Sequence, residues 1–119
     1  MDRLHKLDKY IYTANTGEDS ISIVDVQEGR EIEKMNLQFM TEINVNHFSS
    51  RPTIGPYSLK VNPEGSMLYC INCYESSLYI IDIKNKRIQN RIYVGKYPCE
   101  MDIDWENEIA YVTNGDSNT

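Results

Sequence analysis

The chain has 119 residues, a formal net charge of −6 and a pI near 4.8. This acidic balance argues against a nucleic-acid or acidic-membrane partner, because both attract clustered Lys and Arg. No apolar run reaches the roughly 18 residues that a membrane span needs. The first nine residues lack the apolar segment of a signal peptide. Three cysteines form no disulfide framework. Together, the missing signal peptide and the missing disulfide framework predict a reduced, cytoplasmic protein.

Short segments with a period of two predict β-strands along most of the chain. Ile21 and Ile23, for example, alternate with Ser20 and Ser22. In chain order, we expect strands at residues 9–14, 20–26, 31–36, 57–62, 67–72, 77–83, 87–93, 99–104 and 109–114. Turn residues separate these segments, and no stretch has the apolar spacing of a helix.

The strands belong to a repeated unit. A segment that begins with Tyr and ends three residues later with Asn occurs at 12–15, 69–72 and 111–114. The last two copies are 42 residues apart and the first two 57 apart, so the first repeat carries an insertion of 15 residues. The predicted repeats cover 9–54, with the insertion at about 37–54, then 55–96, and a truncated third repeat at 97–119.

Four short antiparallel strands in each 40 to 45 residues are typical of a β-propeller blade. The motifs Gly55-Pro56-Tyr57, 61–65, 68–72, 80–82, 94–98 and 111–114 resemble the YVTN-type β-propeller repeat family. That family includes bacterial and archaeal surface-layer-like proteins and is related to lactonase-like seven-bladed propellers. The resemblance implies an all-β fold, and because relatives are often exported it leaves the localisation open.

The chain is too short for a closed ring, since about four blades of this size need roughly 170 residues. With the strands of a blade labelled A to D from the centre outward, the predicted order is B-C-D, A-B-C-D, A-B. The sequence therefore predicts a partial β-propeller of about two to two-and-a-half four-stranded blades. Its open edges predict that the partners are other propeller blades, of the same or a longer chain.

Polar residues at strand ends have an expected role in turns. We expect the side chains of Asn15, Asn72 and Asn114 to bond to the backbone two residues on, and Asp25 and Asp82 to act alike. In the third repeat, Asn107 replaces the Gly of the turn at 62–65. We expect Asn107 to adopt the left-handed backbone there.

The loops that enter the A strands of a propeller surround the central channel. This placement brings His47, Arg51, Tyr57, Tyr97 and Glu100 to the predicted channel mouth. The set is a candidate binding site for a peptide, glycan or small molecule. The alternative interpretation is a solvated loop region with no ligand.

Three cysteines and three carboxylates are candidates for a metal site. Cys70 and Cys73 form a C-x-x-C pair that Cys99 could join, but structural zinc needs four ligands and no fourth is evident. Packing thiols are the alternative. Glu100, Asp102 and Asp104 share one face of a strand and could hold a hard cation or form a polar surface. We predict no metal and no cofactor.

Three classes of function agree with these patterns. The first is a non-enzymatic propeller scaffold for binding or protein interaction, because the repeats consist of strands and turns without a recognisable catalytic set. The resemblance to lactonase-like propellers implies the second, a part of a hydrolase. The third is a structural component of a surface layer or coat.

Overall fold

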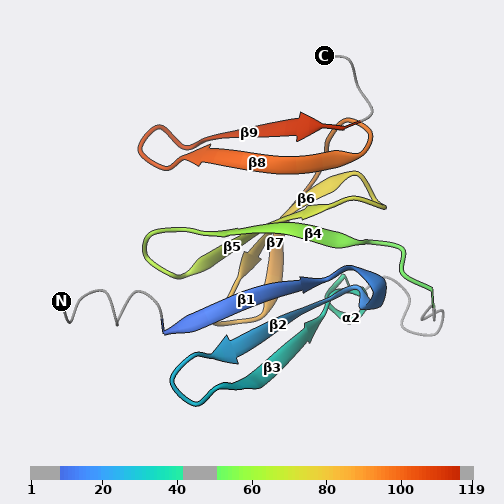
Figure 1. Ribbon diagram of the computed structural model, residues 1–119. Helices are drawn as coiled ribbons and strands as arrows, with labels where there is room; N and C mark the ends of the chain where they lie inside the picture. The colour runs from blue at the N-terminus through green and yellow to red at the C-terminus, as the bar shows by residue number, and fades with distance from the viewer. Residues whose placement is uncertain (1–8, 42–50, 116–119) are drawn as a thin grey trace.

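The computed structural model describes residues 9–41 and 51–115 (Figure 1). These residues form three antiparallel sheets. The first contains β1 (Tyr10–Asn15), β2 (Ser20–Asp25) and β3 (Arg30–Asn36). The second contains β4 (Pro56–Val61), β5 (Met67–Asn72), β6 (Ser77–Asp82) and β7 (Arg87–Tyr93). The third contains β8 (Pro98–Asp104) and β9 (Ile109–Asn114).

The prediction of an all-β fold is confirmed, and each expected strand end lies within one residue of the observed end. The sheets have three, four and two strands, in the predicted order. Two short helical turns interrupt the strands, the 3-10 turn η1 (Thr16–Glu18) and the four-residue helix α2 (Leu37–Met40). No helix among the described residues is long and apolar enough to cross a membrane.

The sheets pack face to face, so the second sheet has an apolar core on each side. Ile21, Ile23 and Met35 of the first sheet pack in one core with Tyr79 and Ile81 of the second. On the opposite face of the second sheet, a smaller core joins residues of β5 and β6 to β8. Its fully or nearly buried members are Ile71, Leu78 and Met101. The period of two in β6 therefore divides its side chains between two neighbouring sheets.

The asparagines at strand ends correct one expectation. Asn15 Nδ2 donates to Ser20 Oγ at 3.0 Å and to Ser22 Oγ at 2.8 Å, and Asn72 Nδ2 donates to Ser77 Oγ at 3.1 Å. Ser20 and Ser77 stand directly opposite these asparagines in the paired strands. The expected bond to the backbone two residues on is therefore wrong for Asn15 and Asn72, whose side chains join two strands instead.

The aspartates open turns as expected, but each bonds to a backbone N–H three residues on rather than two. Asp25 Oδ1 accepts the N–H of Glu28 at 3.0 Å, and Asp82 Oδ1 accepts the N–H of Asn85 at 3.2 Å. Asp104 repeats the Asp82 arrangement with Asn107 at the same 3.2 Å distance. The turn in the third repeat is thus kept, but its left-handed residue is Glu108, with φ 57°, and the expectation for Asn107 is wrong.

A buried carboxylate fixes the segment that leads into the second sheet. Asp19 is fully buried, and its oxygens accept the backbone N–H groups of Thr53, Ile54 and Gly55 at 2.6 to 3.2 Å. Its Oδ2 also accepts Gln38 Nε2 at 2.7 Å, so α2 is bonded to the same group. Successive N–H groups around one anion form a nest, a backbone cavity that favours negative charge.

We predict that Asp19→Ala lowers the free energy of unfolding by about 3 kcal/mol or more, because it leaves several buried donors without an acceptor. Urea denaturation gives the change. The matched control is Ser76→Ala at the same place in the second repeat, which also has left-handed backbone (φ 59°, against 56° at Asp19). We expect that control to cost less than about 1 kcal/mol. Equal losses in the two variants would show that the carboxylate does not anchor the loop.

Candidate functional site

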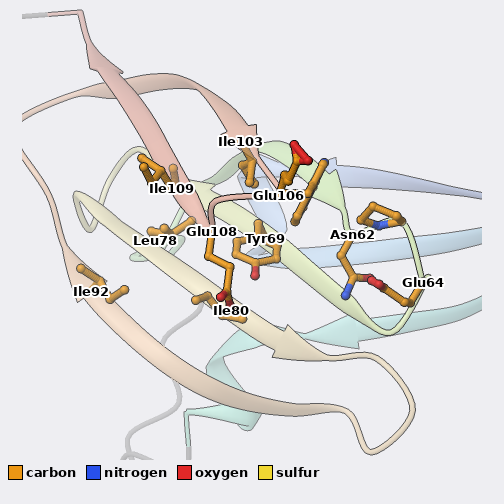
Figure 2. A pocket seen from close by; sticks show the side chains of 13 residues that line it. Asn62, Glu64, Tyr69, Leu78, Ile80, Ile92, Ile103, Glu106, Glu108 and Ile109 are labelled. Carbon is orange, nitrogen blue, oxygen red and sulfur yellow. The ribbon is translucent and has the colours of Figure 1, made fainter.

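A groove of about 530 Å³ opens between the second and third sheets (Figure 2). One wall consists of residues of β5, β6 and β7, and the other of residues of β8, β9 and the hairpin between them. The apolar side chains that define it are Tyr69, Leu78, Ile80, Ile92, Ile103, Trp105 and Ile109. Carboxylates of Glu64, Glu106 and Glu108 line the same groove. The groove therefore has an apolar interior, and carboxylates from two turns line it as well.

The first repeat shows how such a face looks when it is covered. Ile23 and Met35 correspond, at the spacing of 57 residues, to Ile80 and Ile92. Ile23 is 6% exposed and Met35 is 2% exposed, whereas Ile92 is 44% exposed and Ile80 is half-buried. The groove thus lies over apolar positions whose counterparts are core residues in the first repeat.

The difference follows from the number of strands in the covering sheet. The core around Ile23 and Met35 includes Tyr79 and Ile81 of β6, and Ile88 of β7 packs against it. The third sheet, in the described part of the chain, has only β8 and β9 and no counterpart of β6 and β7. Ile80 stays half-buried and Ile92 exposed because, in the described part of the chain, that sheet lacks the strands that would cover them.

The groove was not predicted from the sequence, although one signal pointed to it. Trp105 replaces the Pro of the equivalent turn in the second repeat, and its ring meets Tyr69 edge to face at 5.2 Å. A large aromatic residue at a turn otherwise made of polar residues is unusual enough to suggest packing. Trp105 is also the single tryptophan of the chain, so its fluorescence reports on the groove.

Of the predicted channel-mouth residues, those that the structure describes lie in or next to the segments that lead into β4 and β8. These segments lie at the end of the molecule opposite the hairpins that connect β4 to β5 and β8 to β9 (Figure 1). Tyr57 is 58% exposed and Tyr97 is 59% exposed. In the described part, Tyr57, Tyr97 and Glu100 form no hydrogen bond or ion pair with one another. His47 lies outside the described residues.

Arg51 lies at the start of the described segment that leads into β4, where its carbonyl oxygen accepts Gln38 Nε2 at 3.1 Å. This bond places Arg51 near α2 and near the segment that Asp19 fixes. A binding role for Arg51, Tyr57, Tyr97 and Glu100 stays a prediction.

Among the described residues, no three His, Cys, Asp or Glu side chains are placed to hold a metal ion. Cys70 is fully buried, its Sγ donates to Asn72 Oδ1 at 3.2 Å, and burial raises the pKa of its thiol. Cys73 and Cys99 are half-buried. Asp102 is exposed. The pKa of Asp104 is lowered by hydrogen bonds from Asn107, so this carboxylate stabilises a turn.

No protein-family model matches the sequence, and no curated protein matches it. The structure is similar to a chain of the Kuenenia stuttgartiensis hydrazine synthase, a protein with β-propeller domains, at a TM-score of 0.70 and 22% sequence identity. The match covers 91% of this chain and 26% of that one. At this identity the likeness concerns the fold alone. The resemblance to the YVTN-type family stays a prediction.

The thiols provide a check of this local geometry. We predict that Cys73 and Cys99 react with a thiol reagent in the native chain, whereas Cys70 reacts only after unfolding, because burial keeps it protonated and covered. Timed alkylation followed by mass spectrometry of peptides identifies each site. Early modification of Cys70 under native conditions would contradict the described packing of β5.

Proposed function

We propose that this chain is a non-enzymatic β-propeller scaffold whose function is interaction with further propeller blades. The groove between the second and third sheets is the interaction surface. Its occupant is a two-stranded β-hairpin equivalent to β6 and β7, which pairs with β9 and completes the third blade. The observation that carries the proposal is the exposure of Ile92 at a position where the first repeat has Met35 at 2% exposure.

The open edge of β9 supports the same occupant. β9 pairs with β8 on one side, and the third sheet has no strand on its other side in the described part of the chain. Ile109 is 43% exposed and Tyr111 is 58% exposed on this edge strand. An unpaired edge binds an added strand through main-chain hydrogen bonds. The second strand of the hairpin would then extend over Ile80 and Ile92.

Apolar burial supplies the driving force. Complete burial of an isoleucine side chain contributes about 1.5 to 3 kcal/mol, and the groove offers several partly exposed ones. In a repeat fold, much of the stability comes from interfaces between neighbouring units. The similarity to a segment of a much longer propeller-containing chain agrees with a unit that works within a larger assembly. No contact among the described residues favours the lactonase-like hydrolase or the surface-layer component, which stay predictions.

The test completes the third blade. Thr119 aligns with Ser77, the first residue of β6, so a copy of residues 78–93 added after Thr119 continues the repeat in register. We expect this extension to raise Tm by at least about 5 °C. We also expect it to shift Trp105 emission to shorter wavelength, because the groove loses water.

The matched control carries the same extension with its copies of Tyr79, Ile81 and Ile88 replaced by Ser. These three side chains contribute to the covered first interface, so their loss should remove most of the gain in Tm. If both extensions leave Tm and Trp105 emission unchanged, a strand pair is not the occupant of the groove, and the proposed function fails.

A further inference from the structure

The segment leading into β8 repeats the backbone of the segment that Asp19 fixes. Tyr97 has φ 51° where Gly55 has φ 72°. The carbonyl oxygen of Tyr97 accepts the N–H of Gly115 at 2.7 Å, as that of Gly55 accepts Cys73 at 2.8 Å. The two segments are therefore copies of one nest-forming backbone, 42 residues apart.

The residue that faces this second nest is different. Ser76 takes the place of Asp19 and has the same left-handed backbone, with φ 59° against 56°. Its carbonyl oxygen accepts Val94 N–H at 2.8 Å, as that of Asp19 accepts Leu37 N–H at 2.8 Å. The turn is thus conserved in position between the repeats, while the carboxylate is replaced by a shorter hydroxyl side chain.

Because Ser76 replaces Asp19, backbone N–H donors beside it lack an acceptor in the part of the chain that the structure describes, and a cavity remains next to them. The backbone N–H groups of Lys96 and Tyr97 correspond to those of Ile54 and Gly55, and within the described residues they have no hydrogen-bond partner. A cavity of about 430 Å³ lies beside them, lined by Cys73, Tyr74, Ser76, Lys96 and Tyr97. The first repeat therefore shows which group fits the nest, and the second repeat lacks that group.

The chemistry of the lining favours an anion with an organic part. Lys96 stands where the first repeat has the buried Ile54, which adds a cation beside the nest. Tyr74 and Tyr97 are more than half exposed and offer aromatic surface. A bulky residue such as Tyr97 at positive φ is strained, and such strain is concentrated at functional positions.

We propose that this cavity binds a small organic carboxylate, whose carboxylate group takes the place that the Asp19 carboxylate occupies in the first repeat. The N–H groups of Lys96 and Tyr97 donate to its oxygens. The Lys96 ammonium adds attraction, and the rings of Tyr74 and Tyr97 contact the organic part. The site lies on segments between β5 and β6 and between β7 and β8, so it does not depend on an occupant of the inter-sheet groove.

The test is a titration of the ¹⁵N-labelled chain with sodium acetate and sodium succinate at constant ionic strength. We expect the amide signals of Lys96 and Tyr97 to shift and to saturate. The signals of Ile54 and Gly55 serve as an internal control, because Asp19 already bonds to those groups. They should stay in place throughout the titration.

Two variants distinguish a specific carboxylate site from nonspecific electrostatic attraction of anions. Ser76→Asp supplies the missing carboxylate, so we expect it to abolish the saturable shifts and to raise Tm. Lys96→Met keeps the nest but removes the charge, and we expect a dissociation constant two- to fivefold higher, about the effect of an exposed ion pair.

Three results would overturn the site. The first is no saturable shift at Lys96 and Tyr97 with either carboxylate. The second is an equal response with chloride or sulfate in place of the carboxylates, which indicates attraction of any anion to Lys96. The third is an unchanged response in folded Ser76→Asp. None of these results bears on the extension experiment, so the carboxylate site and the scaffold function fail or stand separately.

Discussion

The burial of each sheet against the next is the constraint on which the rest of this structure depends. The second sheet is apolar on both faces, so it needs a neighbour on each side. On one side, residues of β6 and β7 meet a nearly complete cover, and Ile21 and Leu37 become fully buried. On the other side, the described part of the chain provides a cover of two strands, and the outer part of the face stays open. The second sheet therefore shows both the covered and the partly uncovered form of the same apolar interface.

A polar anchor sets how neighbouring sheets are joined on the well-covered side. Asp19 belongs to the first repeat, but the backbone groups it binds lead into the second sheet. A fully buried carboxylate is costly unless its oxygens are hydrogen-bonded, and here four donors surround it. Because these donors come from two different segments, the carboxylate fixes the position of α2 and of the approach to β4 together.

The sequence predicts the strands well and the polar contacts only in part. Period two and the internal repeat locate every described strand, and Asp25 and Asp82 act as their turn positions suggest. The bonds of Asn15 to Ser20 and Ser22 depend on strand register, which a linear pattern leaves open. The role of Asp19 depends on backbone partners 34 to 36 residues away, at the end of the insertion. The sequence predicts Tyr97 at the channel mouth, but its place in the cavity beside Ser76 and Lys96 follows from the structure alone.

The two openings of this molecule have different physical origins, and this difference separates their functions. The groove exists because, among the described residues, the third sheet has fewer strands than the second, so strands that complete the sheet would cover it. The cavity beside Lys96 exists because one residue differs between two otherwise equivalent turns, Asp19 in one and Ser76 in the other. Added strands do not restore that carboxylate. A blade that completed the third sheet would therefore cover the groove and keep the cavity, so the association proposed for the groove and the carboxylate binding proposed for the cavity are independent of each other.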